Sequence, residues 1–231
     1  MDEIYPQIAI AGENALIVYF DDHPSAFISA KIAQTVESLH TALGDLIIDW
    51  VPSYTSLLVS YDPLRTDHFF VGQTIRRALQ SSADPSLQSP GGRVCLSVYY
   101  SMESGPDLAR LADRANLSID AVITLHQQTE YTVYAVGFAP GFAYLGEVDP
   151  RLAMPRQATP RRHVPAGSVA IADRQTAVYP SDSPGGWNLI GRCPEALFNP
   201  QNDPSSPFKV GDRVHFNSIS RDTYLAMGGM L

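Results

Sequence analysis

Two short runs rich in glycine, proline and aromatic residues constrain the fold of this chain more than any other feature. Residues 137–146 read GFAPGFAYLG, and residues 183–187 read SPGGW. Proline fixes φ, and glycine permits positive φ and the close approach of other atoms, so each run predicts a rigid turn. A tight β-turn over a core would explain either run alone. Together they indicate a concave surface lined by backbone amides and aromatic rings rather than an acid–base dyad.

The first 103 residues have the pattern of an α+β unit. Ser25 is suited to begin a helix and Gly44 to end it, and the apolar residues between them recur at helical spacing. A second helix is predicted at 66–82. Strands are predicted from apolar and aromatic runs at 15–20, 45–51, 54–61 and 93–100. This β-α-β-β-α-β order is that of a ferredoxin-like fold, and the proline- and glycine-rich residues 83–92 are interpreted as a long loop inside it.

The pattern changes after residue 103. Pro106 and Ser118 each begin a short amphipathic stretch, so residues 104–129 are predicted to form connecting helices. From 130 to 231, short apolar stretches alternate with glycine, proline, asparagine and aspartate, which favours an all-β barrel or sandwich. The chain is therefore expected to hold two domains, residues 1–103 and residues 130–231.

Composition indicates a soluble, cytoplasmic protein. The chain has 231 residues, of which 45% are hydrophobic, yet no apolar run approaches the roughly 20 residues that span a bilayer. Its first residues lack the features of a signal peptide. A net charge of −8 argues against nucleic acid or an anionic membrane as a partner. Cys95 and Cys193 are far apart, and the six histidines are scattered, so no metal site is expected.

One segment of this acidic chain is rich in arginine. Between residues 151 and 162 there are four arginines and no acidic residue. Arg156 and Arg161 each follow a proline, and we expect them to bind an anion, which is either a ligand carboxylate or an acidic partner surface. Arg151 and Arg162 are expected to be solvated surface residues.

Many short motifs occur in an order that resembles a known family. They include SYTSLLV at 53–59, GPDL at 105–108, YTVY at 131–134, DPR at 149–151, MPR at 154–156, ATPR at 158–161, VPAGSV at 164–169, LIGR at 189–192, GDRV at 211–214 and the two runs above. Taken together they resemble the family that includes allophanate hydrolase subunit 1, the B subunit of 5-oxoprolinase and the Kip inhibitor of a sporulation histidine kinase. The same module forms part of the carboxyltransferase region of urea carboxylase. The resemblance covers most of the chain and implies a cyclophilin-like barrel in its second half.

The resemblance implies one of three alternative functions. The first is one component of an ATP-dependent 5-oxoprolinase, which would use ATP and Mg²⁺ at the level of the complex and open 5-oxo-L-proline to L-glutamate. It would act with a second carboxyltransferase-type subunit (the C-type subunit of 5-oxoprolinase) and a lactam-hydrolysing subunit (the A-type). The second is a regulator that inhibits a histidine kinase. The third is carboxyl transfer in urea or allophanate metabolism. A departure from the family, Ser101-Met102 in place of a glycine pair, leaves the particular substrate open.

Several known catalytic and cofactor-binding motifs are absent from the sequence. No lysine follows the glycine spacing of Gly141 and Gly146, so no Walker loop is present, and Ser168 lies outside any nucleophile elbow. No Ala-Met-Lys-Met occurs, so the chain does not carry biotin itself. His126 matches a histidine usual in the family and is either a structural hydrogen-bonding residue or a base. Trp187 is either a core residue or a wall of the site. The candidates for binding substrate or anion are Arg156, Arg161, Pro140, Gly141, Tyr144, Gly185, Gly186, Trp187, Arg192 and His126.

Overall fold

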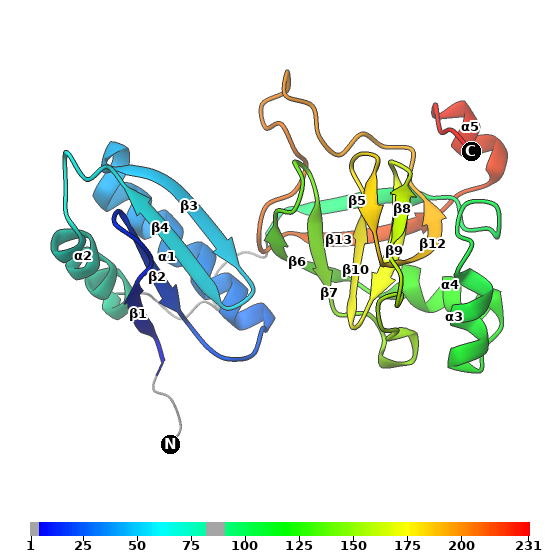
Figure 1. Cartoon of the computed structure of the whole chain (residues 1–231), viewed down its shortest axis with the longest axis horizontal. Coiled ribbons are helices and arrows are strands. Elements are labelled where there is room, and N and C mark those ends of the chain that lie inside the picture. The colour runs from blue at the N-terminus through cyan, green and yellow to red at the C-terminus, as the bar shows by residue number, and fades with distance from the viewer. Residues whose placement is uncertain (1–4, 82–90) are drawn as a thin grey trace. The chain divides into compact units, whose positions relative to one another are not determined.

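The chain forms two compact units, Met1–Pro90 and Gly91–Leu231, in a computed structural model that describes residues 5–81 and 91–231 (Figure 1). The helices predicted to connect two domains lie within the second unit. Within the described residues, every helix is too short or too polar to cross a membrane.

The N-terminal unit packs two helices against a four-stranded antiparallel sheet. Helix α1 (Ala26–Leu43) begins where Ser25 Oγ accepts a hydrogen bond from the Ile28 amide, at 3.1 Å, and it ends at Gly44, whose φ is 48°. The sheet has the order β1-β2-β4-β3. Its other elements are β1 (Gln7–Ile10), β2 (Ala15–Tyr19), η1 (Gly44–Leu46), β3 (Ile47–Ser53), β4 (Ser56–Tyr61) and α2 (His68–Ser81). Alternate residues of β2 and β4 are buried in one cluster with the apolar faces of both helices, as period-2 and period-3.6 patterns require.

One strand predicted for this unit belongs to the other. Strand β5 (Arg93–Val98) pairs in parallel with β13 (Arg213–Ser218) in the second sheet, and the position beside β2 is occupied by β1. The ferredoxin-like arrangement is therefore not confirmed, and its predicted last strand was placed in the wrong unit. A local apolar pattern predicts a strand but carries no information about its partner. The loop predicted at 83–92 lies mostly outside the described residues.

The second unit is a nearly closed barrel, which confirms the predicted β domain in its coarse form. Its mixed sheet has the order β12-β9-β10-β7-β6-β13-β5. The two edges meet at a bridge between Tyr99 and Arg192, whose amides donate to each other's carbonyls at 2.8 and 2.9 Å. The remaining barrel strands are β6 (Tyr131–Val136), β7 (Ala143–Gly146), β9 (Ser168–Ala172), β10 (Gln175–Val178) and β12 (Asn188–Arg192).

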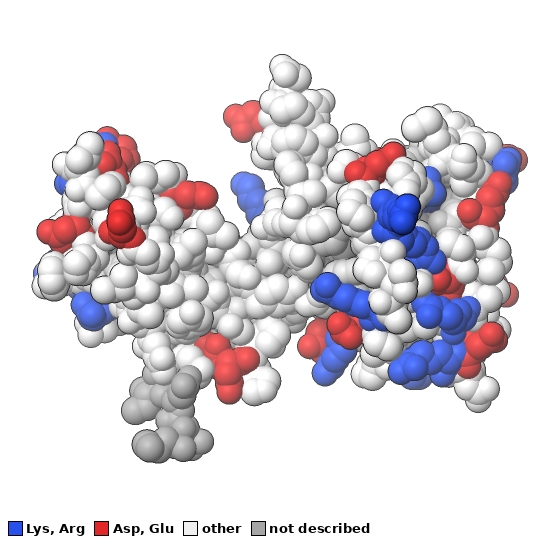
Figure 2. Space-filling view, in the orientation of Figure 1, with Lys and Arg blue, Asp and Glu red and all other residues white. Residues whose placement is uncertain are grey.

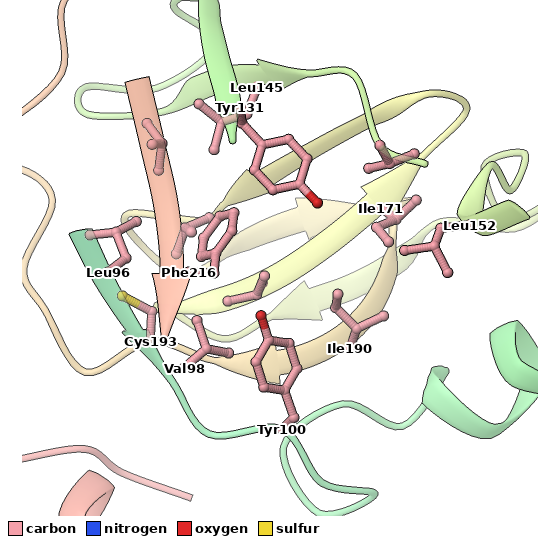
Figure 3. Packing of buried hydrophobic residues seen from close by; sticks show 14 of the residues in the cluster. Leu96, Val98, Tyr100, Tyr131, Leu145, Leu152, Ile171, Ile190, Cys193 and Phe216 are labelled. Atoms are coloured by element: carbon pink, nitrogen blue, oxygen red, sulfur yellow. The ribbon is translucent and has the colours of Figure 1, made fainter. Parts of the chain in front are cut away.

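The interior of the barrel is filled by aliphatic and aromatic side chains (Figure 3). Tyr100 and Tyr131 enter this core from different segments, and both hydroxyl groups point inward in Figure 3. Helices α3 (Leu108–Ala115) and α4 (Ile119–Gln128) pack against it, and α4 begins where Ser118 Oγ accepts from the Ala121 amide at 3.1 Å. Helix α5 (Arg221–Ala226) and η3 (Pro150–Leu152) complete the unit.

A second apolar layer covers the outside of the barrel at β9 and β10. Val169 and Ile171 of β9 face the interior, whereas Ala170 and Ala172 belong to a separate outer cluster. A ribbon of β8 (Arg161–Val164) and β11 (Ser183–Gly185) packs over it, contributing Val164. Small alanines on the outer face leave room for large rings from neighbouring segments. Both faces of β9 are therefore buried, and the candidate site is built on this outer layer.

Candidate functional site

The two glycine- and proline-rich runs meet in the outer layer. Phe142 and Tyr144, from the first run, contact Trp187, from the second, with ring centroids 5.8 and 6.0 Å away. Tyr179 joins them, 5.4 Å from Phe142 with the rings nearly perpendicular. Edge-to-face packing of this kind stabilises aromatic pairs beyond simple burial. We call Phe142, Tyr144, Tyr179 and Trp187 the outer aromatic cluster.

Glycines in both runs are required by close approach. A Cβ on Gly185 would lie 2.3 Å from the Tyr179 hydroxyl oxygen, and one on Gly141, where φ is +82°, would lie 2.5 Å from the Leu197 carbonyl oxygen. Neither position tolerates a side chain without movement of its neighbour. Pro140 is exposed at the tip of the first turn. The predicted rigid turns are thus present and hold the cluster in one arrangement.

Arg156 lies over Trp187. Its guanidinium carbon is 5.7 Å from the centre of the indole, a distance at which a cation is attracted to the face of the ring. The arginine side chain is exposed, whereas Trp187 is 5% exposed. Among residues 5–81 and 91–231, Arg156 has no ion pair. Its positive charge is therefore held in place but is not neutralised by the protein.

Arg161 has the opposite environment. Its Nη2 lies 2.8 Å from the carboxylate of Asp107, and its Nη1 donates to the Trp187 carbonyl at 3.3 Å. Asp107 is buried, and its carboxylate also accepts from Gln157 Nε2 at 3.0 Å and from the Leu189 amide at 2.7 Å. Arg161 is therefore locked into an internal ion pair beside the cluster. The two arginines expected to bind an anion both contact Trp187 but differ in how free they are to bind.

The loop around Arg156 is fixed by the segment that carries Trp187. Asn188, which is fully buried, donates from Nδ2 to the Pro155 carbonyl at 3.0 Å. On the other side of Arg156, the Gln157 amide donates to the Gly186 carbonyl at 2.7 Å. These two hydrogen bonds place residue 156 opposite residue 187. They also give Gly186 a role as a backbone acceptor.

Two other candidates lie elsewhere in the unit, and the first is Arg192. This residue ends β12, whereas Trp187 precedes that strand, and its Nη1 donates to the Met230 carbonyl at 3.1 Å. It lines an open cavity of about 470 Å³ together with Cys193 and Tyr224. Burial raises the pKa of the Cys193 thiol well above its usual range, so this thiol is not a reactive nucleophile. Arg192 is therefore not part of the outer aromatic cluster.

The second, His126, is a core residue. It is completely buried, with Nδ1 2.7 Å from the Tyr100 hydroxyl and Nε2 2.9 Å from Thr176 Oγ1. Thr176 donates its own proton to the Ala170 carbonyl, so Nε2 carries the histidine's proton and Nδ1 accepts from Tyr100. Burial lowers the pKa of His126 to about 3, which keeps it neutral. The geometry supports the structural role of His126 and separates it from any substrate.

The arginines expected to be solvated are exposed. Arg151 makes a two-pronged ion pair with Asp149, at 2.8 and 2.7 Å, and its hydrogen bonds lower the pKa of Asp149 to about 2. Arg162 is exposed at the surface. Arg174 pairs with Glu147. Figure 2 shows that lysine and arginine side chains gather on the second unit.

The polar residues that organise the site were not predicted. Asp107, Gln157 and Asn188 were not singled out, although Asp107 lies in the GPDL motif. The available signal was the aspartate at a helix start, which favours the interpretation of a capping residue. In the structure its side chain makes no cap hydrogen bond with α3. Its carboxylate is therefore available to the loop that carries the arginines.

The cluster is suited to binding rather than to acid–base chemistry. Its rings provide aromatic walls, and beside them lie the uncompensated guanidinium of Arg156 and the Asp107 carboxylate, which already accepts from three donors. In the described part of the chain, one group of three side chains has metal-ligand spacing: Asp21, Asp22 and His23, in a loop of the other unit. His23 Nδ1 already lies 2.7 Å from Asp22, and the loop gives no reason to assign an ion there.

Comparisons with known proteins agree with this architecture along nearly the whole chain. Residues 6–208 match the family described as carboxyltransferase domain, subdomain C and D. The chain is 37% identical over 229 residues to the B subunit of 5-oxoprolinase from Bacillus subtilis, covering 95% of each protein. It is 38% identical over 210 residues to the 5-oxoprolinase B subunit of Escherichia coli O157:H7, covering 90% of this chain and 93% of that protein.

A solved structure shows the same fold at similar identity. The crystal structure of TTHA0988 is 36% identical, with a TM-score of 0.77 over 89% of this chain, and the match covers 40% of that longer chain. Sequence match, identity and fold lead to one conclusion. This chain belongs to the family of carboxyltransferase domains, subdomain C and D.

Proposed function

We propose that this chain is the B-type subunit of an ATP-dependent 5-oxoprolinase that hydrolyses 5-oxo-L-proline to L-glutamate. The observation that carries the proposal is the agreement with a 5-oxoprolinase B subunit across 95% of both proteins. Similarity of this extent includes the segments that build the outer aromatic cluster. The proposed substrate also fits a site that binds a small anion, because 5-oxoproline carries a carboxylate.

The proposed enzyme is a hetero-complex. The outer aromatic cluster supplies binding groups, and the carboxylate beside it is occupied, so bond cleavage requires groups from other subunits. The proposed partners are a second carboxyltransferase-type subunit, of the C type, and a lactam-hydrolysing subunit, of the A type. ATP with Mg²⁺ acts at the level of the complex, where phosphorylation of the lactam carbonyl oxygen would activate the ring for hydrolysis.

Within this complex, Arg156 is the proposed anion-binding residue of this chain. Its guanidinium is exposed and uncompensated, and the Trp187 ring beneath it limits its orientations. It would bind the substrate carboxylate or a phosphoryl oxygen through charge-assisted hydrogen bonds. The turn at Pro140 and Gly141 would shape the site. Its Phe142 amide would not bind the anion, because it already donates to the Ala139 carbonyl at 2.9 Å.

Reconstitution tests the proposal. The purified chain, its two proposed partner subunits, ATP, Mg²⁺ and 5-oxo-L-proline are combined, and glutamate and ADP are measured over time. We expect both products to appear together and only when all three subunits are present, and we expect size-exclusion chromatography to show a complex with the C-type subunit. Turnover by the single chain would contradict the need for partners. Absence of glutamate together with suppressed autophosphorylation of a histidine kinase would favour the regulator instead.

A further inference from the structure

Arg156 and Arg161 belong to one loop, but only Arg156 carries a free charge. Arg161 Nη2 lies 2.8 Å from Asp107, whereas Arg156 has an aromatic ring beneath it and, within the described ranges, no acidic partner. The side chain of Arg161 is about a quarter exposed, and that of Asp107 is nearly inaccessible. An ion pair this sheltered is screened little by solvent. The protein thus supplies its own anion to Arg161.

Asp107 connects three segments that are far apart in the sequence. It directly precedes α3, yet its carboxylate does not cap that helix. Instead it accepts from the Leu189 amide of β12 at 2.7 Å, and its own amide donates to the Leu189 carbonyl at 3.0 Å. The same carboxylate grips the arginine loop through Gln157 and Arg161. It therefore fixes the loop relative to the start of β12, where Trp187 is held.

Arg156 lies between the points at which its loop is held. Asn188 holds the Pro155 carbonyl, and the Gly186 carbonyl holds the Gln157 amide. Arg110 supports the same arrangement, since it donates to Asn188 Oδ1 and lies 3.7 Å from the Asp107 carboxylate. With both neighbours of residue 156 fixed, its side chain has a defined starting point over the Trp187 ring.

We infer that Asp107 is a positioning residue: it pairs with Arg161 as an internal strut, so that Arg156 alone presents its guanidinium to the carboxylate of a small ligand. The inference deepens the proposed function and rests on it only for the choice of ligand, 5-oxo-L-proline. It assigns different tasks to two arginines that the sequence does not distinguish.

The two possible roles of Arg161 predict opposite effects of removing the Asp107 charge. If Arg161 bound the ligand itself, Asp107 would compete with that ligand, and Asp107→Asn would strengthen binding. If Arg161 is a strut, Asp107→Asn loosens the loop and weakens binding, because an amide cannot accept from all three donors. The sign of the effect therefore decides between them.

The test is a titration of the full chain by itself. The chain has two tryptophans, so Trp50→Phe leaves Trp187 as the sole emitter, directly beneath Arg156. In that background 5-oxo-L-proline is added and Trp187 fluorescence is followed. We expect a saturable change, a dissociation constant raised roughly ten- to a hundredfold by Arg156→Gln, and one raised severalfold by Asp107→Asn or Arg161→Ala. The double variant Asp107→Asn/Arg161→Ala should bind no more weakly than the weaker single variant, because both changes break the same strut.

Controls keep the outcome decisive. Asp149→Asn alters an exposed arginine pair elsewhere and should leave the dissociation constant unchanged, and a far-UV circular dichroism melt confirms that each variant is folded. If Asp107→Asn fails to fold, Gln157→Ala, which removes a second tie between the loop and Asp107 but keeps Arg161, should weaken binding if Asp107 positions the loop and leave it unchanged if Arg161 binds the ligand itself. Tighter binding by Asp107→Asn, or no response of the parent chain, would overturn the inference. Glutamate release by the reconstituted complex would still support the proposed function in either case.

Discussion

The sheet of the N-terminal unit buries one face against α1 and α2 and leaves Ile10 and Ile48 exposed, whereas the barrel sheet of the second unit is buried on both faces along β9. Charge differs as well. Residues 1–90 contain four basic and eleven acidic residues, and residues 91–231 contain twelve and thirteen. The acidity of the chain is thus concentrated in the unit that lacks the arginine loop. The second unit therefore combines an outer apolar layer with a nearly balanced charge. Arg156 lies over the Trp187 ring of that layer.

The largest effect on stability is expected from Trp187→Ala, which removes the indole from the outer aromatic cluster. Removing a buried tryptophan is expected to lower the free energy of unfolding of the second unit by about 3–5 kcal/mol. Urea unfolding followed by far-UV circular dichroism measures the change. Trp50 is then the sole tryptophan and reports on the N-terminal unit, whose transition should not move. A shift in the Trp50 transition equal to that of the second unit would contradict the separation of the two units.

Arg156→Ala tests the proposed anion site in the proposed complex. Loss of a charge-assisted hydrogen bond is expected to lower kcat/KM for 5-oxo-L-proline by roughly ten- to a hundredfold. The matched control is Arg151→Ala, because Arg151 is exposed and already paired with Asp149. Steady-state glutamate release measures both. Equal losses in the two variants would show that general surface charge, rather than Arg156, matters.

The second unit should be weakened by mild acid through His126. This histidine has a pKa of about 3 when folded and about 6.5 when unfolded, so below pH 6.5 only the unfolded chain takes up its proton. The contribution of neutral His126 to the free energy of unfolding is complete above pH 6.5. It falls by about 1.4 kcal/mol per pH unit as the pH drops from 6.5 toward 3. Urea unfolding of the Trp50→Phe variant at pH 7, 6 and 5 measures this slope. His126→Gln should remove this component even though it also lowers stability.

The smallest expected effect lies in the N-terminal unit. Ser25→Ala removes the cap of α1 and should lower the stability of that unit by about 1 kcal/mol. Trp50 fluorescence in a Trp187→Phe background measures it. Ser25→Asp, which preserves a capping oxygen, should retain most of the stability. Should the alanine variant prove as stable as the parent, packing alone would hold α1.

Much of the local structure was predictable. Ser25 and Gly44 lie at the two ends of α1, as expected, because capping and positive φ are properties of single residues. Strand β5 was recognised but placed in the wrong sheet, since its partner β13 lies near the other end of the chain. Strand β1 was not predicted, because its four residues are too few to show a pattern. Local patterns predict elements, and pairing over long distances in the sequence decides the topology.

The site divides in the same way. The rigid turns, Trp187 and Arg156 stand out by composition, so the sequence indicates their importance. Asp107 does not stand out, because its partner Arg161 is 54 residues away and an aspartate just before a helix is an ordinary residue for that position. His126 could be recognised as a candidate, but its burial between Tyr100 and Thr176 depends on the packing of the barrel. The residues proposed to bind were easier to single out from the sequence than the residues proposed to position them.

The parallel pairing of β5 with β13 has a consequence for the order of events during protein synthesis. The chain leaves the ribosome from its N-terminus, and all four strands of the first sheet lie within the first 61 residues. That sheet can therefore assemble early. Strand β5 emerges next but must wait for residues 213–218, near the end of the chain, before its partner exists. Until β13 emerges, β5 has no neighbouring strand and the growing sheet ends at β6. In this interval a chaperone or an assembling partner would protect the unpaired strands most effectively.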